Sequence, residues 1–340
     1  MGNDPIPVIT LPFPVRKHPM AEAIETHTRR WAHQFGLARS EAAVRTLACS
    51  RFGEFGAYAY PAVGLVEAQL AADWLGWLFI ADDQLEVGNY GTTQSWREVT
   101  QAVRGVLEPS PAAAVAGPMA DAPLIRALDD ISHRLDQLGS PAWKKRFARH
   151  FMEAMAAAAR EIDLRDRKTA PRLFEYAALR REAGGVIPCF DLIEICRPDS
   201  EVPADVHTSA SFREFVATAT DIVSWTNDLR SVDKEVACGI MSNIVLVLQH
   251  QGQLSREQAL GAAHALIDDR IKDLLAAEHH LSGLVDDLAL DAPTQEALRW
   301  YVAGVRDWIA GSNHWHSKGT DRFLGAGTEH VEDLLDPHAR

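Results

Sequence analysis

Residues 65–86 read LVEAQLAADWLGWLFIADDQLE and hold the features that decide the fold. Residues 65–80 are almost entirely apolar, which predicts a central helix buried on all sides. At its end stand Asp82, Asp83 and Glu86, and steps of three and four residues bring their carboxylates together. Carboxylates at a helix C-terminus repel one another and oppose the helix dipole unless a cation neutralises them. The alternatives are a solvated helix end or a divalent metal site.

Helical spacing of apolar residues continues on both sides of this segment, and no run alternates as a strand would. We therefore predict an all-α protein, a single-domain antiparallel helical bundle. The proline-rich residues 1–18 are predicted to be an extended arm that caps the site, and residues 19–340 to be the helical domain. The predicted helices are 22–35, 40–49, 65–80, 124–138, 142–162, 173–196, 211–236, 240–251, 256–281 and 294–315, and residues 108–123 are predicted to be a loop.

Composition and charge exclude several classes of function. The 340 residues carry a net charge of −13, and no run of Lys and Arg provides the basic surface that a nucleic-acid-binding protein needs. An acidic protein binds an anionic substrate only through a metal ion or a local basic cluster. The four cysteines are scattered, and no apolar run reaches the length of a membrane span. We expect a soluble, cytoplasmic protein, either a monomer or a homodimer.

A second polar cluster lies within predicted helix 211–236. Asn227, Ser231 and Glu235 follow one another at four-residue steps, so they form a stripe along one face. They offer an amide oxygen, a hydroxyl and a carboxylate, which are the hard oxygen ligands that Mg²⁺ takes together with phosphate. A polar stripe on an exposed helix is the alternative. Arg230 and Lys234 flank the stripe and could meet an anion.

The two clusters together resemble the motifs of bacterial class I terpene synthases, or terpene cyclases. The stretch from Asp82 to Glu86 is similar to the aspartate-rich motif of that family, and the Asn227, Ser231 and Glu235 stripe is similar to its metal-binding triad. The likeness extends from the N-terminal arm to the C-terminal helix. It implies the class I terpenoid synthase fold with a central apolar cavity, and three Mg²⁺ ions, for which Mn²⁺ can substitute, held by Asp82, Asp83, Glu86, Asn227, Ser231 and Glu235.

The resemblance also implies residues that contact the diphosphate of a substrate. The family has an arginine 46 positions before the first triad residue, and Arg181 stands there. Lys234 and Arg322 complete the charge, although Phe323 replaces the tyrosine that follows this second arginine in the family. A helix break at Gly184 and Gly185 would aim the carbonyl of Gly185 at the reacting carbon. Glycine permits such a break, and a plain kinked core helix is the alternative.

An aromatic wall would shield the carbocation that forms when diphosphate leaves, because aromatic ring faces attract cations. The candidates are Phe55, Trp77, Phe79, Trp225, Trp308 and Trp315. Each of these could equally be an ordinary core residue. His279, His280, His314 and His316 lack the spacing of a zinc site and are interpreted as solvated or packed histidines.

The sequence thus predicts a Mg²⁺-dependent lyase that ionises and cyclises a prenyl diphosphate. The favoured substrate is farnesyl diphosphate (C15), giving a sesquiterpene hydrocarbon or alcohol plus diphosphate. A cyclase of geranylgeranyl diphosphate (C20) that makes a diterpene is the first alternative. A chain-elongating prenyl diphosphate synthase would need a second aspartate-rich motif in place of the triad, and a non-catalytic all-α interaction protein would release no diphosphate.

Overall fold

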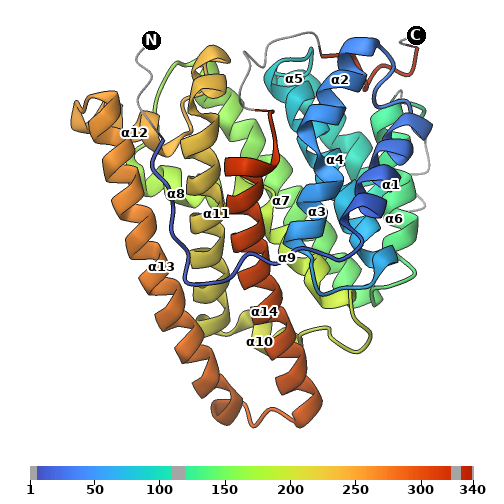
Figure 1. The fold of residues 1–340 in the computed structure, drawn as a ribbon. Helices are drawn as coiled ribbons and strands as arrows, with labels where there is room; N and C mark the ends of the chain where they lie inside the picture. Colours follow the sequence, from blue (N-terminus) through green and yellow to red (C-terminus); the bar gives the residue numbers. More distant parts are fainter. Residues whose placement is uncertain (1–5, 109–118, 323–330, 339–340) are drawn as a thin grey trace.

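The computed structural model describes residues 6–108, 119–322 and 331–338, and these residues contain helices and no strand, as predicted (Figure 1). The helices pack side by side as a bundle around α4 and α11. Their bounds are α1 Ala21–Gln34, α2 Glu41–Ser50, α3 Phe52–Ala59, α4 Leu65–Glu86, α5 Thr93–Leu107, α6 Pro123–Leu135, α7 Pro141–Asp166, α8 Leu173–Ala183, α9 Val186–Ile195, α10 Ala204–Thr208, α11 Ala210–Ala237, α12 Ile244–Gly252, α13 Arg256–Asp287, α14 Ala292–His314 and the π-helix η1 Trp315–Gly319.

Helix α4 is the buried centre that the sequence predicts, and it continues through the acidic cluster to Glu86. Trp74 and Trp77 are fully buried and stack with their ring centroids 5.7 Å apart. The indole of Trp77 donates a 2.8 Å hydrogen bond to the carbonyl of Leu124, which ties α4 to the start of α6. Because its apolar length is packed on all sides, the last turn of α4 has a fixed place in the bundle.

Several elements differ from the sequence prediction. The predicted helix 173–196 is two helices, since Gly184 ends α8 and Gly185, at φ 63°, precedes α9; this confirms the predicted break. Helix α5 was not predicted, although Trp96, Val99 and Val103 give it helical spacing. Helix α12 begins at Ile244 rather than at 240, because the side chain of Asn243 caps it through the backbone N–H of Val245.

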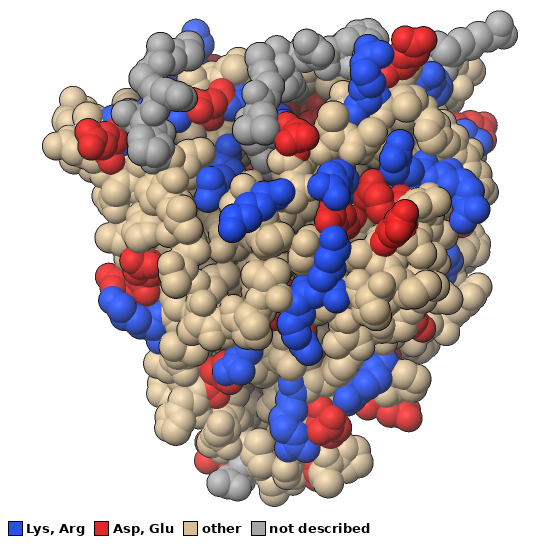
Figure 2. Space-filling view, viewed as in Figure 1, with Lys and Arg blue, Asp and Glu red and all other residues tan. Residues whose placement is uncertain are grey.

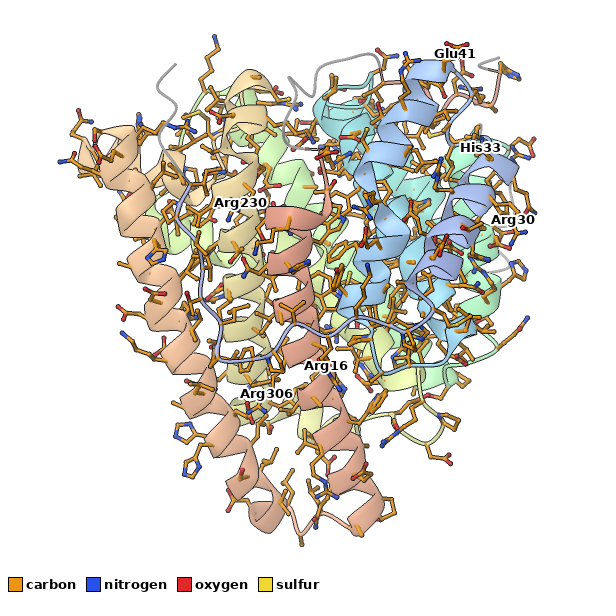
Figure 3. The ribbon with its side chains drawn as sticks, in the orientation of Figure 1. Arg16, Arg30, His33, Glu41, Arg230 and Arg306 are labelled. Atoms are coloured by element: carbon orange, nitrogen blue, oxygen red, sulfur yellow. The ribbon has the colours of Figure 1, made fainter. Side chains whose placement is uncertain are left out.

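The described part of the N-terminal arm, residues 6–18, lies along the outside of the bundle (Figures 1 and 3). The carbonyl of Ile9 accepts a hydrogen bond from Asn313 of α14, and Arg16, labelled in Figure 3, donates at 2.7 Å to Asp307 of the same helix. None of residues 6–18 lines the cavity described below; this part of the arm packs against α14, and capping of the site by the arm stays a prediction. Residues 1–5 lie outside the described residues.

Charged side chains of both signs share the face drawn in Figure 2. Arg306, labelled near the middle of this face in Figure 3, donates to Glu278 at 2.8 Å, and Arg16 is held by Asp307. Over the described ranges, we find no helix that is both long and apolar enough to cross a membrane.

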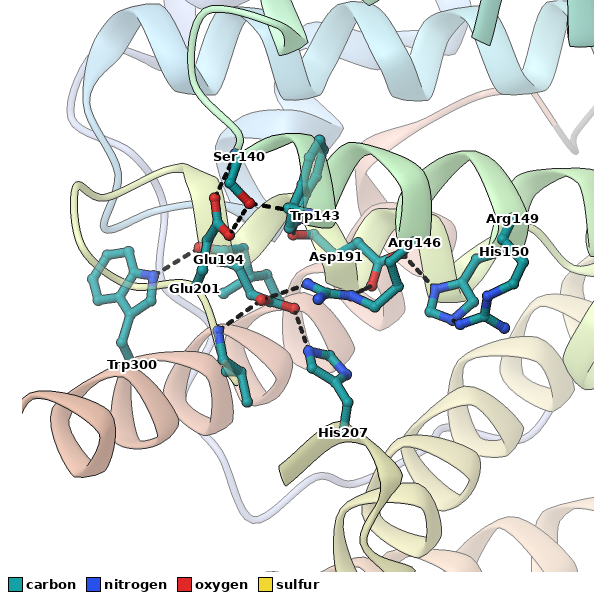
Figure 4. Close-up of polar contacts among 12 residues, drawn as sticks. Ser140, Trp143, Arg146, Arg149, His150, Asp191, Glu194, Glu201, His207 and Trp300 are labelled. Atoms are coloured by element: carbon teal, nitrogen blue, oxygen red, sulfur yellow. Dashed lines mark hydrogen bonds and ion pairs between the residues drawn. The ribbon is translucent and has the colours of Figure 1, made fainter. Parts of the chain in front are cut away.

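A buried ionic network fixes the C-terminal half of α9, as Figure 4 shows. Asp191 and Glu194 on α9 are 1% and 0% exposed. Arg146 of α7 donates to Glu194 at 2.7 Å and lies 3.7 Å from Asp191. His150 contacts Asp191 at 2.7 Å and His207 contacts Glu194 at 3.0 Å. Helix α9 is therefore tied to α7 and α10 by charge as well as by packing.

The Arg146 side chain is expected to be essential to stability, because its loss leaves two buried carboxylates without their cation. The Arg146→Met variant should be less stable by about 3–5 kcal/mol, measured by chemical denaturation. Arg160→Met on the same helix is the control. Arg160 is 57% exposed and pairs with Glu182, so its loss should change stability by less than about 0.5 kcal/mol. Equal effects of the two variants would contradict the role given to Arg146.

Candidate active site

A cavity of about 200 Å³ opens between the ends of α4 and α11. Its lining comes from eight helices, α3, α4, α5, α7, α8, α9, α11 and α14, and from η1. Both polar clusters of the sequence contribute to one rim of this cavity. The residues present there are Asp82, Glu86, Asn227, Ser231, Lys234, Glu235 and Arg322. The structure therefore brings together two motifs that lie far apart in the chain.

On the α4 side of the rim, two cations hold the carboxylates. Arg322 donates to Asp83 at 2.7 Å, and the ammonium of Lys234 lies 3.1 Å from Asp83 and 2.6 Å from Glu86. Burial acts to raise the pKa of Asp83, but Arg322 and Lys234 outweigh it and lower this pKa below its usual value. Asp82 has accessible surface that faces the cavity. Burial within the bundle wall and the nearby Glu86 raise its pKa to about 7.

On the α11 side, the predicted stripe is continuous. The hydroxyl of Ser231 lies 2.6 Å from Oε1 of Glu235, and Asn243 donates to Oε2 of Glu235 at 2.9 Å. Burial, reinforced by the charge of Asp228, raises the pKa of Glu235 to about 8. Asn227 lies one turn before Ser231 and lines the same cavity. Asn243 was not singled out in the sequence, and it reaches Glu235 because it caps α12.

Helix α7 adds a carboxyl group that sequence reasoning missed. Glu161 lines the cavity, and its pKa is raised to about 8 by burial and by the charges of Asp82, Asp228 and Glu86, against the lowering effect of Arg180. The only sequence signal was a single acidic residue after the alanine-rich run of α7, which surface residues share. Burial is the largest cause of the raised pKa at all three carboxyl groups, and the charges of neighbouring carboxylates add to it.

This donor set fits hard divalent cations, because it consists of carboxylate, amide and hydroxyl oxygens with excess negative charge. Within the described ranges, no three His, Cys, Asp or Glu side chains converge on one point as a complete metal site would require. The α4 side and the α11 side of the rim are therefore each a partial set of metal ligands. Any metal ion bound here would take its remaining ligands from water or from an anionic substrate.

Adjacent arginines on α8 have different partners. Arg181, which the resemblance proposes for diphosphate, points away from the cavity lining and donates to both oxygens of Asp221 at 2.6 and 2.7 Å. Arg180 lines the cavity and donates to Asp228 and to Asn227, each at 2.9 Å. Neighbouring helix positions lie about 100° apart, so only the packed helix shows which arginine faces the site.

The apolar part of the cavity has aromatic walls. Four predicted residues line it, namely Phe55, Trp77, Phe79 and Trp308. Trp315 does not; it stacks behind Phe55 with centroids 4.5 Å apart and donates to the carbonyl of Ser50. Trp225 is also absent from the lining, whereas Trp96 and Phe151, which were not predicted, belong to it. Gly185 lines the cavity at the helix break, and its carbonyl accepts from the thiol of Cys189 at 3.3 Å.

The C-terminal segment 331–338 holds the acidic end of α4 in place. Gln84, which is 1% exposed, donates to the carbonyl of Glu332 at 2.9 Å and accepts from the N–H of Leu334 at 3.1 Å. Leu334 and Leu335 are buried beside it. Gln84, which lies between Asp83 and Glu86 in the sequence, thus attaches the last turn of α4 to the C-terminal segment. Phe323, the departure from the family motif, lies outside the described residues.

The crowded carboxyl groups make the metal-free protein sensitive to pH. Glu161 keeps its proton in the folded state up to a pKa of about 8, whereas the unfolded chain releases it near the usual value. Stability should therefore fall as pH rises through this window, and Asp82 and Glu235 act in the same direction. Between pH 5 and 8, Glu161→Gln should lose less stability than wild type, by about 3 kcal/mol.

Denaturant titrations of the metal-free protein at the two pH values test this expectation. Glu153→Gln is the control, because Glu153 lies on the same helix but is 52% exposed and paired with Arg149. It should keep the pH dependence of the wild type. An unchanged pH dependence in the Glu161→Gln variant would show that this carboxyl is not crowded by the others.

Comparisons with known proteins agree on one family. The family model described as "Terpene synthase family 2, C-terminal metal binding" matches residues 73–273, which contain both polar motifs. Pristinol synthase of Streptomyces pristinaespiralis is 32% identical over 320 residues, covering 94% of this chain and 85% of that protein. A (+)-T-muurolol synthase of Roseiflexus castenholzii, named as "(2E,6E)-farnesyl diphosphate cyclizing", is 30% identical over 318 residues and covers 92% of each.

Solved structures show the same arrangement of helices. Wild-type cucumene synthase superimposes with a TM-score of 0.79 at 28% identity, covering 91% of this chain and 99% of that one. Hedycaryol synthase in complex with nerolidol gives a TM-score of 0.78 at 22% identity and covers 92% of this chain and 99% of that one, which supports the fold alone.

Proposed function

The chain belongs to the terpene synthase family and is a class I terpene cyclase, and from this premise we propose that it converts farnesyl diphosphate into a sesquiterpene and diphosphate with Mg²⁺ as its metal. The observation that carries the proposal is the meeting of two oxygen-rich motifs at the rim of one apolar cavity. The related muurolol synthase, named for farnesyl diphosphate, supports the C15 substrate.

The residues that would hold the metal are Asp82, Asp83 and Glu86 on α4 and Asn227, Ser231 and Glu235 on α11. Three Mg²⁺ ions, or Mn²⁺ in their place, would stabilise the negative charge of the departing diphosphate and so supply the driving force for ionisation. The protein side chains that could donate to the diphosphate are Lys234, Arg322 and Arg180, because all three line the cavity beside these carboxylates. Arg181 would first have to leave Asp221.

Below this rim the chain supplies the environment that a carbocation needs. Phe55 contacts both Phe79 and Trp308 edge to face, with ring centroids 6.2 and 5.4 Å apart, and all three rings line the cavity. Such walls exclude the water that would quench the cation early, and their ring faces attract positive charge. Gly185 lines the same cavity, and its carbonyl is proposed to stabilise charge at the reacting carbon.

Incubation with Mg²⁺ and each of the C10, C15 and C20 prenyl diphosphates, followed by gas chromatography–mass spectrometry, tests the substrate. We expect a sesquiterpene from the C15 diphosphate, because related cyclases of similar length include a farnesyl diphosphate enzyme. Cyclic product from only the C20 diphosphate would replace this proposal with a diterpene cyclase. Products of longer chain length would indicate an elongating synthase, and no release of diphosphate would overturn the proposal altogether.

The Asp82→Asn variant should lose activity by about 100-fold or more, because a neutral amide cannot replace a carboxylate in binding cations that stabilise the leaving group. Turnover is measured by diphosphate release at saturating Mg²⁺. Asp129→Asn makes the same chemical change on α6, where the carboxylate is 56% exposed and faces His133, and it should leave turnover unchanged. Near-normal turnover of the Asp82→Asn variant would contradict the metal-binding role.

A further inference from the structure

A histidine at the cavity rim has no role in the account so far. We propose that His316 is a positioning residue that fixes the side-chain amide of Asn227, so that its oxygen rather than its nitrogen is available as a metal ligand. This inference rests on the proposed function, since it concerns one of the proposed ligands. The sequence interpretation of His316 as a packed histidine correctly describes its burial but not its partners.

The backbone places His316 in the rim by means of an unusual turn. Helix α14 ends at His314 and continues as the π-helix η1, residues Trp315–Gly319. Within this wider turn, Trp315 packs behind Phe55 whereas His316 lines the cavity. Single π-turns inside helices occur frequently at functional sites. The turn thus allows consecutive residues to serve the core and the cavity.

The protonation of the imidazole follows from its neighbours. Nδ1 of His316 lies 2.8 Å from the carbonyl oxygen of Ser312, which can only accept a hydrogen bond. Nδ1 must therefore carry the hydrogen. In the neutral ring, Nε2 then has a free lone pair and is an acceptor. Arg180 can only donate, and it holds Oδ1 of Asn227, so the group that faces Nε2 is the amide nitrogen, and a neutral ring fits this contact.

The acceptor at Nε2 determines the orientation of Asn227. Nε2 lies 2.8 Å from Nδ2 of Asn227, so the amide nitrogen donates to the imidazole. On the other side, Oδ1 of Asn227 accepts from Arg180 at 2.9 Å. A flipped amide would place two acceptors together at His316 and two donors together at Arg180. Both contacts therefore select the same orientation.

The orientation matters because only one end of an amide can bind a metal ion. Oδ1 has two lone pairs, of which Arg180 uses one, whereas an amide nitrogen has none to offer. Arg180 is itself held by Asp228 at 2.9 Å. His316 thereby supplies the second of two fixed contacts, and groups that orient a metal ligand in this way commonly change metal affinity by about 10–100-fold when they are removed.

Two variants of His316 distinguish the effect of the hydrogen-bond acceptor at Nε2 from the effect of the packing of the aromatic ring. His316→Phe keeps an aromatic ring against Phe55 and Phe79 but loses the acceptor. His316→Gln loses the ring, but the Gln side chain can place an oxygen near the position of Nε2. If the acceptor is what matters, the Phe variant should be impaired and the Gln variant should not. If packing is what matters, the order should be reversed.

The measurement is binding of Mg²⁺ together with inorganic diphosphate by isothermal titration calorimetry, with thermal unfolding in their absence as the check on folding. We expect His316→Phe to bind about 10-fold more weakly or worse, and His316→Gln to bind close to wild type. Binding by His316→Phe that equals wild type, or equal losses in both variants, would overturn the inference. If His316→Phe does not fold, His316→Leu, which also lacks the acceptor, takes its place.

A second variant pair gives an independent test. Both oxygens of a carboxylate can bind a metal ion, so the orientation at position 227 loses its importance in the Asn227→Asp variant. His316→Phe should therefore weaken the binding of Mg²⁺ and diphosphate clearly less in the Asn227→Asp background than in the wild-type protein. An undiminished loss would contradict the inference. Failure of the wild type itself to bind Mg²⁺ with diphosphate, or to turn over any prenyl diphosphate, would instead contradict the proposed function.

Discussion

The constraint on which this structure depends is the packing of several carboxyl groups at the rim of an apolar cavity. Asp82, Glu161 and Glu235 all have raised pKa values there, because burial and mutual repulsion disfavour their charged forms. Lys234 and Arg322 offset part of the charge by pairing with Asp83 and Glu86. The remaining excess is proposed to attract divalent cations to the rim and, through them, an anionic substrate. A rim of this kind is unfavourable on its own, so the rest of the fold has to hold it together.

The fold does this by fixing each side of the rim to a different part of the bundle. On the α4 side, Gln84 is clamped by the backbone of Glu332 and Leu334, so the C-terminal segment holds the turn that carries the acidic motif. On the α11 side, Asn243 supports Glu235 from the cap of α12, and His316 and Arg180 hold the two ends of the Asn227 amide. At the opposite end of α9, Arg146 balances Asp191 and Glu194 and keeps the glycine break beside the cavity. These supporting residues carry no motif of their own, yet they determine where the proposed ligands point.

Metal binding and carbocation chemistry need opposite surroundings, and this cavity provides both within a short distance. The acidic motif of α4, the stripe of α11 and their cations Lys234 and Arg322 lie at the rim, where diphosphate is proposed to lie. The depth of the cavity is formed by Phe55, Trp77, Phe79, Trp96, Phe151 and Trp308. The polar edges of Trp77 and Trp96 are satisfied by backbone carbonyls of Leu124 and Met155, so their indoles present apolar faces without leaving a buried N–H unpaired. The two environments are separated along the helices themselves. Helices α4 and α11 place polar side chains at the rim from one turn and apolar side chains in the cavity from an earlier turn.

The sequence by itself determined the helical class, the buried course of α4 and the two oxygen-rich motifs, because each of these is a local pattern in spacing and residue type. It also located the helix break, since the two glycines mark it. The resemblance proposed Arg181, whereas Arg180 is the arginine that lines the cavity, and the sequence did not separate the cavity-lining Trp96 and Phe151 from the buried Trp315. Those assignments depend on the rotation of a packed helix by about 100° per residue, which no local pattern records. The roles of Glu161, Gln84 and His316 were likewise decided only in the tertiary structure. Most of the groups that surround them come from distant parts of the chain, and a single polar residue in a sequence has no signal of its own until packing removes it from water and sets its neighbours.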